Sequence, residues 1–327
     1  MASTTDLDRV LAAWGRTGAR VVPLDSESSN RWRVEHGDEA ALLRRYDEAW
    51  PADAVAFQHE VLAFLAERAW PVPVPIATPA GGTAVEADGT RWSLFPLLPG
   101  APPPDESIFL QRRGALLALV HADLAEWDVA PPQAARQRVD DFDAAVQPHG
   151  LASFEALLAR VQSIDPLSAN LLAVLRMRIE EQLETYRYSE LLAFPLWGGC
   201  TSEHVLFDGN DVTGLIDFDK MRADARAVDV AESILADTRS IGWRIIRWVA
   251  GYAAHAKPSL SQQEADLVPV LMAAIMLRRT AATLAEAHAA GRLDADALAC
   301  IDEARTVEAN EDDLREVIRT AARISPA

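Results

Sequence analysis

Short runs of apolar or alternating residues dominate the first hundred positions and predict strands. Polar or glycine-containing turns separate these runs. They cover 20–24, 31–35, 40–46, 83–86 and 91–95. Between the third and fourth runs, apolar residues recur at helical spacing over 54–70, and Leu7, Val10, Leu11 and Trp14 do so near the start of the chain;. We therefore expect an antiparallel meander with one helix inserted after its third strand and another helix before it.

Beyond residue 100 the pattern is mostly helical. Helical spacing covers 106–127, 151–161, 166–190, 226–255 with a break near Gly242, 261–290 and 294–322;. One hairpin interrupts it, because β-type runs at 205–207 and 212–216 flank the turn 208–211;. The proline-rich segment 99–104 is the best linker candidate;. The pattern predicts an α+β protein with a β-rich N-terminal lobe, residues 1–100, and a helical C-terminal lobe, residues 101–327, that carries the hairpin 205–217.

Composition narrows the class of protein. The chain has 327 residues, half of them apolar, which is enough for a large core divided between two lobes;. Cys200 and Cys300 are too few and too far apart for a disulfide framework or a thiolate metal site;. No run of eighteen uncharged apolar residues occurs, and the N-terminus has no basic region followed by an apolar one;. We expect a soluble, cytoplasmic protein.

The formal charge of −18 bears on the partners. Such a charge repels phosphate, so it argues against non-specific binding to nucleic acid or to an anionic membrane. A small molecule or a protein is the expected partner. The acidic surface would favour a cationic ligand, with Asp224, Glu232 and Asp237 as candidate contacts. The alternative is that the acidic residues serve solubility alone.

Four motifs follow one another in the order of a known family. The stretch 204–219 reads H-V-L-F-D-G-N-D-V-T-G-L-I-D-F-D. It resembles the N-V-L-F-D-G and V-T-G-V-I-D-F-D stretch of the aminoglycoside phosphotransferase and homoserine kinase family. Residues 226–231 are similar to that family's R-x-x-D-L-A, residues 28–34 to its nucleotide loop and residues 94–100 to its hinge. The resemblance implies a protein-kinase-like two-lobe fold with ATP and Mg²⁺ as cofactors.

The same resemblance implies metal and phosphate positions. Asp217 stands where the family has its principal magnesium ligand, with Asp219 as a second candidate;. The alternative for both is a solvated aspartate. Arg44 and Glu60 fit the basic residue on the third strand, which holds phosphates, and the helix glutamate that pairs with it, unless a slip in register exchanges Arg44 with Arg45;. The nucleotide-loop and hinge positions are Asn30, Phe95 and Leu97.

The chain departs from the family in the catalytic loop. The family reads H-G-D-x-x-x-x-N there, and residues 197–204 read W-G-G-C-T-S-E-H. Gly199 replaces the aspartate that orients or deprotonates the attacking hydroxyl, and His204 replaces the asparagine that binds metal;. Since glycine has no side chain to accept a proton, the family's mechanism cannot run unchanged. Loss of such a base lowers the reaction rate by a factor of about 10² to 10⁴.

Two hypotheses remain open at this point. The first is a pseudokinase that serves as a binding or regulatory module. The second is an enzyme, either an ATP-dependent small-molecule kinase with a displaced base such as Glu203 or a protein that uses the site for other chemistry;. Cys200 has no adjacent base or cation that would activate it as a nucleophile;. Retention of Asp217 argues against free drift of the whole site.

Overall fold

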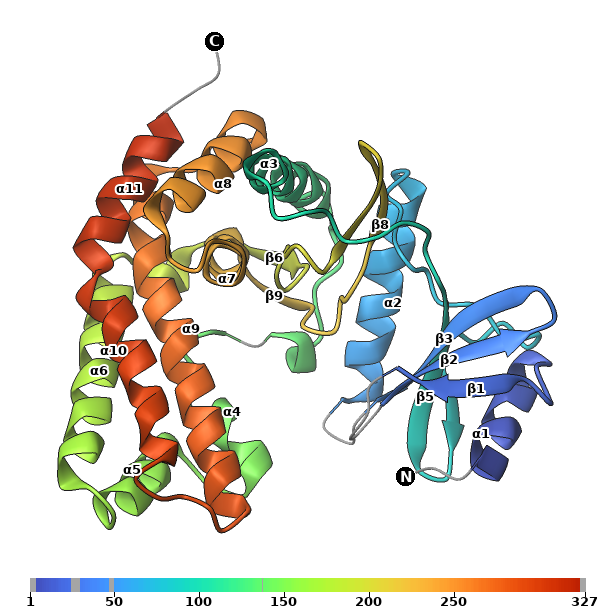
Figure 1. Ribbon diagram of the computed structural model, residues 1–327, viewed down its shortest axis with the longest axis horizontal. Coiled ribbons are helices and arrows are strands. Elements are labelled where there is room, and N and C mark those ends of the chain that lie inside the picture. The colour runs from blue at the N-terminus through green and yellow to red at the C-terminus, as the bar shows by residue number, and fades with distance from the viewer. Residues whose placement is uncertain (1–3, 25–29, 47–49, 137, 324–327) are drawn as a thin grey trace. The chain divides into compact units, whose positions relative to one another are not determined.

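The chain folds into two compact units (Figure 1). The computed structural model describes residues 4–24, 30–46, 50–136 and 138–323. The first unit contains the chain up to Pro103 together with 132–135 and 203–217. The second contains 104–131, 136–202 and the chain from Phe218 onward. The structure confirms the predicted α+β class, since one unit is built on an antiparallel sheet and the other mainly from helices.

The first unit is built on a five-stranded antiparallel sheet with the strand order β1-β2-β3-β5-β4. The strands are β1 (Arg20–Pro23), β2 (Arg31–His36), β3 (Glu39–Tyr46), β4 (Val85–Ala87) and β5 (Thr90–Pro96). Apolar residues of α1 (Thr4–Leu11) and of the following turn pack with alternate residues of these strands, such as Val34 and Leu43. Residues at the intervening positions of β3 and β5 contact α2 (Ala52–Glu67) instead. Alternation along the strands therefore places Arg44 on the face that meets α2.

The hairpin of β7 (Val205–Asp208) and β8 (Asp211–Leu215) belongs to the first unit. Ala101 and Phe207 exchange two backbone hydrogen bonds, and Leu215 N–H donates to the carbonyl of Pro71 over 2.8 Å. A Cβ atom on Gly100 would lie 2.2 Å from Thr213 Oγ1, so the connector and the hairpin approach closely only because residue 100 is glycine;. We expected the hairpin to belong to the helical lobe, whereas its contacts group it with the β-rich one.

The second unit is built from long helices and a two-stranded sheet. The helices of more than eight residues are α3 (Ser107–Leu124), α5 (Phe154–Gln162), α6 (Pro166–Thr185), α7 (Arg226–Thr238), α8 (Gly242–His255), α9 (Gln262–Ala289), α10 (Ile301–Ala309) and α11 (Glu311–Arg323). Helices α3 and α8 come close together at Gly114. A Cβ atom at this position would lie 2.1 Å from the carbonyl oxygen of Trp248. The sheet pairs β6 (Ala193–Leu196) with β9 (Arg222–Ala225). The helix expected over 294–322 is interrupted at Asn310.

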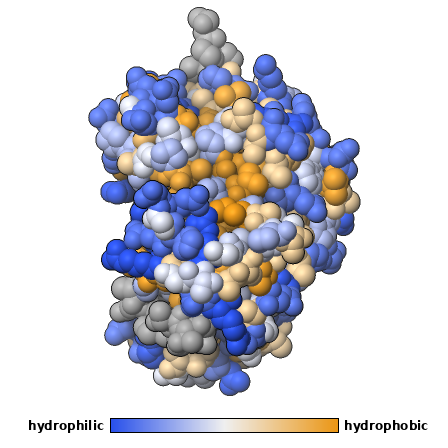
Figure 2. All heavy atoms as spheres, turned by 90° about the vertical axis from the view of Figure 1, so that its right-hand side faces the viewer, coloured by the Kyte–Doolittle hydropathy of each residue, from blue (hydrophilic) through white to orange (hydrophobic). Residues whose placement is uncertain are grey.

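Helix α9 has the length and hydropathy of a membrane-spanning helix, but 72% of its most apolar window is buried inside the protein. Such burial is typical of the core helix of a soluble protein. Hydrophilic residues cover much of the face shown in Figure 2.

Candidate functional site

The expected metal ligand Asp217 is held by two basic side chains of the first unit. His204 Nε2 lies 3.0 Å from Asp217 Oδ2, and Arg31 Nη1 lies 3.9 Å from Oδ1. The backbone brings the first pair together, because Ile216 N–H donates to the carbonyl of His204 over 2.9 Å. Arg31 comes from β2 on the sheet. The carboxylate therefore meets a histidine and an arginine of its own chain on its two oxygens.

This set of side chains does not fit magnesium. Mg²⁺ requires hard oxygen ligands in octahedral geometry, and imidazole suits softer ions. The nitrogen of His204 already contacts the Asp217 carboxylate, and the Arg31 guanidinium near the other oxygen would repel a divalent cation;. Over the described ranges no group of three or more histidines, cysteines and acids is arranged to hold a metal. We therefore derive no metal-dependent step for this site.

Arg44 is buried against helix α2 but does not pair with Glu60. Its Nη1 lies 3.4 Å from Gln58 Oε1, and its guanidinium lies 4.4 Å from the centre of the Tyr46 ring. Gln58 is buried and Glu60 is exposed, because residues two apart on a helix face opposite sides;. The expected ion pair between Arg44 and Glu60 is therefore wrong for this structure. A neutral amide contacts the strand cation instead.

A buried histidine completes this polar cluster. His59 Nε2 lies 3.0 Å from the Tyr46 hydroxyl, and its Nδ1 lies 2.8 Å from Thr83 Oγ1. Burial, helped by the positive charge of Arg44, lowers the pKa of His59 to about 4;. The imidazole is therefore neutral at pH 7 and links strand, helix and loop by hydrogen bonds.

The lowered pKa of His59 gives a pH-dependent stability. In the unfolded chain the His59 side chain takes up a proton near the ordinary histidine pKa of about 6.5. In the folded chain it does so only near pH 4. This contribution to stability is present above the unfolded pKa and is lost as the pH falls toward the folded one, by about 2–3 kcal/mol at pH 4.5. Between pH 7.0 and 4.5 the free energy of unfolding, measured with urea, should fall by about 2–3 kcal/mol less in His59→Gln than in the unmodified protein. His36→Gln, at an exposed strand end, is the control, and an equal loss in all three proteins would contradict the prediction.

The nucleotide-loop and hinge candidates have different surroundings. Asn30 is partly buried, and its carbonyl accepts the backbone N–H of Arg45 over 2.7 Å, while Ser28 and Ser29 lie outside the described residues. Phe95 is buried and meets the His59 ring edge to face at 5.8 Å. Leu97 is 36% exposed. Their assignment to nucleotide binding stays a prediction.

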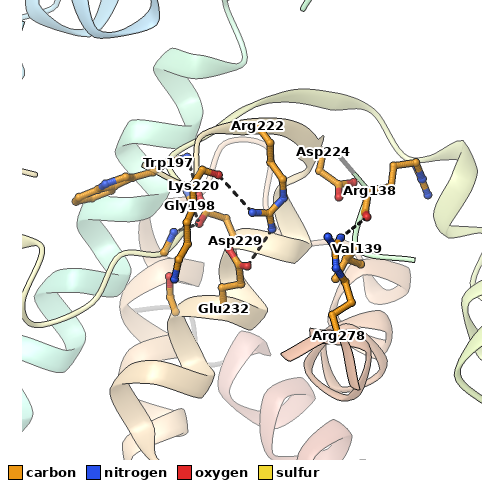
Figure 3. A network of polar contacts seen from close by, with 12 residues as sticks. Arg138, Val139, Trp197, Gly198, Lys220, Arg222, Asp224, Asp229, Glu232 and Arg278 are labelled. Carbon is orange, nitrogen blue, oxygen red and sulfur yellow. Dashed lines mark hydrogen bonds and ion pairs between the residues drawn. The ribbon is translucent and has the colours of Figure 1, made fainter. Parts of the chain in front are cut away.

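In the second unit, the loop after β6 is fixed by one buried carboxylate (Figure 3). Asp229, at the start of α7, accepts the backbone N–H groups of Trp197, Gly198 and Gly199 over 3.0, 3.2 and 2.7 Å. His121 Nε2 lies 3.1 Å from the same carboxylate. Asp229 is completely buried, so these donors and the helix N-terminus stabilise its charge;.

Further polar contacts hold the rest of this loop. Cys200 N–H donates to Ser233 Oγ over 2.9 Å, and Ser202 N–H to Asp237 Oδ1 over 2.8 Å. Asp237 also forms a buried ion pair with Arg113. The whole backbone path from 197 to 202 is thus determined by side chains of α7.

The two glycines of the loop adopt left-handed backbone conformations for different reasons. Gly198 has φ +96°, and a Cβ atom there would lie 2.6 Å from the Cβ of Lys220. Gly199 has φ +120°, but a Cβ atom there would come no nearer than 4.0 Å to Thr201 Cγ2. Space is therefore available at 199, and the backbone conformation is what disfavours any other residue.

The remaining loop candidates differ in exposure. Trp197 is fully buried and stacks on Phe218 with ring centres 5.2 Å apart. Burial raises the pKa of the Cys200 thiol well above its ordinary value, so this cysteine is not a thiolate nucleophile;. Glu203 is exposed, and Asp219 is partly buried. Roles for Glu203 as a base and for Asp219 as a metal ligand stay predictions.

The acids proposed to meet a cationic ligand are occupied by partners within the second unit. The Tyr188 hydroxyl lies 2.7 Å from both carboxylate oxygens of the fully buried Asp224. Glu232 pairs with Arg222 over 3.0 Å, and Asp237 pairs with Arg113. None of these three offers a solvent-facing carboxylate to a cation.

Sequence reasoning missed the residues that determine these arrangements. Asp229 was present in the R-x-x-D stretch but was not assigned to the loop it holds. Gln58 lies two residues before Glu60, and a kinase pairs the strand cation with a glutamate, so the sequence favours Glu60;. Arg31 lies 186 positions before Asp217, and no local pattern links the two residues.

Comparison with known proteins supports the family resemblance. Residues 20–262 match the family model described as the phosphotransferase enzyme family (APH). An uncharacterized protein of Synechocystis sp. is 27% identical over 239 residues, which are 68% of this chain and 62% of that protein. The chain thus spans less than two thirds of the length of that relative.

Solved structures share the fold at low identity. A microcompartment-associated aminopropanol kinase has a TM-score of 0.72 at 17% identity, covering 98% of this chain and 99% of the other. An amicoumacin kinase in complex with AMP-PNP, Ca²⁺ and Ami has 0.67 at 12%, covering 100% and 96%. A spectinomycin phosphotransferase in complex with ADP and spectinomycin has 0.59 at 10%, covering 98% of each. The predicted kinase-like fold is confirmed.

Proposed function

The chain belongs to the phosphotransferase enzyme family, but we propose that it is a pseudokinase. It would then be a cytoplasmic binding module that does not transfer phosphate from Mg²⁺-ATP. The observation that carries the proposal is the pairing of Asp217 with His204 at 3.0 Å, with Arg31 at 3.9 Å. Two cationic or potentially cationic side chains contact the carboxylate of Asp217, the expected principal metal ligand. The charge relation expected of a phosphotransferase is thereby reversed.

Two further substitutions support this proposal. Gly199 lacks the carboxylate that would orient or deprotonate an acceptor hydroxyl;. Arg44 contacts the neutral amide of Gln58 over 3.4 Å, and the glutamate expected to pair with it, Glu60, is exposed on α2;. Each change alone weakens phosphoryl transfer. Because catalytic residues act as a unit, restoring one of them does not restore the activity.

The family fold favours a small molecule as the ligand. The solved amicoumacin kinase is in complex with AMP-PNP and Ami, and the solved spectinomycin phosphotransferase is in complex with ADP and spectinomycin. We propose that this chain binds a small molecule without turning it over. Binding would serve either on its own or to regulate a protein partner. Nucleotide binding would then occur without the magnesium bridge.

Turnover of the unmodified protein tests the proposal. We expect ADP formation from ATP and Mg²⁺, with aminopropanol or spectinomycin as the acceptor, to be slower than in an active family member by a factor of about 10² to 10⁴ or more, because the base is missing. A coupled ADP assay measures the rate, with the active kinase as positive control. Glu203→Gln is assayed in parallel. Robust turnover that depends on Glu203 would overturn the proposal and favour the alternative of an active kinase with a displaced base.

A further inference from the structure

The second unit contains a cavity of about 240 Å³ whose walls are mainly cationic. Its polar lining consists of Lys220, Arg222, Glu232, Arg278 and Arg279, and its apolar lining consists of Val139 and Ile275. Arg222 lies on β9, Glu232 on α7, and the two other arginines on α9. Figure 3 shows Arg222, Glu232 and Arg278 pointing toward the same region.

The side chains that line this cavity carry more positive than negative charge, while Asp224 and Asp141 act on its arginines from outside the lining. Four cationic side chains face one anionic side chain, in a chain whose formal charge is −18. Glu232 pairs with Arg222 over 3.0 Å. Lys220 and Arg279 form no side-chain hydrogen bond or ion pair with any other residue that the structure describes. The lining itself therefore carries an excess of three positive charges.

Buried polar atoms at the cavity lack partners. Arg222 is 9% exposed, and its Nε has no hydrogen-bond acceptor within the described part of the chain. Glu232 Oε2 is likewise buried without a donor. Unsatisfied buried polar atoms are costly and are commonly satisfied by a ligand or by ordered water.

The crowding of cations affects Arg278 as well. Burial, together with the positive charge of Arg222, lowers the pKa of Arg278. Its Nη1 donates to the backbone carbonyl of Arg138 over 2.5 Å, a neutral acceptor that does not cancel the charge. An anion in the cavity would relieve this repulsion.

The cavity lies beside the loop held by Asp229. A Cβ atom on Gly198 would contact both the Cβ and the carbonyl of Lys220, so the backbones of 198 and 220 touch. The carbonyl of Lys220 also accepts Arg222 Nη1 over 3.4 Å. A molecule bound among these cations would sit next to the loop that in the family carries the catalytic aspartate.

We propose that this cavity binds a small anionic metabolite through a phosphate or carboxylate group. Arginine forks and a lysine ammonium are suited to these groups. The volume is below the range of about 300–1,000 Å³ typical of sites for drug-sized ligands, which favours a compact molecule. The proposal reverses the cationic ligand expected from the acidic composition, and it does not depend on whether the first unit supports phosphoryl transfer.

Calorimetric titration and thermal unfolding of the full chain without ATP test the proposal. The probes are inorganic phosphate, glycerol 3-phosphate and succinate, with glycerol as the neutral control. We expect at least one anion to bind and to raise the melting temperature, and glycerol to do neither. Raising the salt from 0.05 to 0.5 M should weaken binding, because added ions screen the attraction. The comparison of phosphates with succinate identifies the group that is recognised, and failure of all three anions would overturn the proposal.

Two variants localise the binding without breaking a structural ion pair. Lys220→Met and Arg279→Gln each remove an exposed cation and should weaken binding by on the order of tenfold;. Arg247→Gln, at an exposed position of α8, is the matched control and should bind like the unmodified protein. Without ligand, both cavity variants should melt at the same temperature as the unmodified protein or higher, since they reduce repulsion. Unchanged affinity in both cavity variants, or an equal loss in Arg247→Gln, would contradict the assignment.

Discussion

Replacement of Asp229 by alanine is expected to destabilise the second unit by at least about 3 kcal/mol. The carboxylate accepts three backbone N–H groups of residues 197–199 and contacts His121, all of them buried. Alanine would leave these donors unpaired inside the protein, and each unpaired donor costs about 1–3 kcal/mol. Urea unfolding followed by tryptophan fluorescence measures the loss, because Trp197 lies in the loop itself.

The control for this prediction is Asp128→Ala, which removes an exposed carboxylate of the same unit. We expect it to change the free energy of unfolding by less than about 0.5 kcal/mol. Asp229→Asn should lie between the two, since the amide keeps one oxygen but turns an N–H₂ toward donors. A loss below about 1 kcal/mol in Asp229→Ala would mean that the loop is not held in the way described.

The double variant Gly199→Asp with His204→Asn is expected not to recover phosphotransferase activity. It restores both polar groups that the family has in this loop, yet its ADP formation should stay at least about 10²-fold below that of an active family member. Gly199 has φ +120°, which an aspartate adopts only under strain, and Arg31 and Gln58 remain unchanged. The coupled ADP assay with Mg²⁺-ATP measures the rate.

Gly199→Ala separates strain from chemistry in this experiment. Alanine carries the same backbone penalty but no carboxylate, so Gly199→Ala and Gly199→Asp, each made alone, should lose about 1–3 kcal/mol of stability. Because a Cβ atom there meets nothing within 3.4 Å, that loss reflects the backbone and not a clash. Near-native stability together with full activity in the double variant would show that the loop was the only defect.

The strands of the first unit were predictable because their alternation is local. Residues 31–35 and 40–46 were assigned within one or two positions of β2 and β3. Strands β6 and β9 were missed for physical reasons. Ala193–Leu196 contains a proline, and Arg222–Ala225 has no β-branched residue, so neither shows strand propensity, and their pairing depends on tertiary contacts;.

Motif order proposes the candidate site residues, whose roles stay predictions, but it does not give their pairing. Motif order located Asp217, Gly199 and His204, because each stands at a fixed distance from the hairpin. The neighbour of Arg44 could not be read in this way, since Gln58 and Glu60 differ only in which side of α2 faces the sheet. The cationic residues of the cavity in the second unit come from β9, α9 and the loop that contains Lys220, and the acidic composition of the chain masks them.

The most direct test of the pseudokinase account is the effect of magnesium on ATP binding. Titration of ATP is best done with the Lys220→Met/Arg279→Gln variant, so that the triphosphate does not enter the basic cavity. We predict that Mg²⁺ does not tighten ATP binding, because His204 and Arg31 already contact the Asp217 carboxylate. Tightening by tenfold or more with Mg²⁺, abolished by Asp217→Asn, would contradict the account.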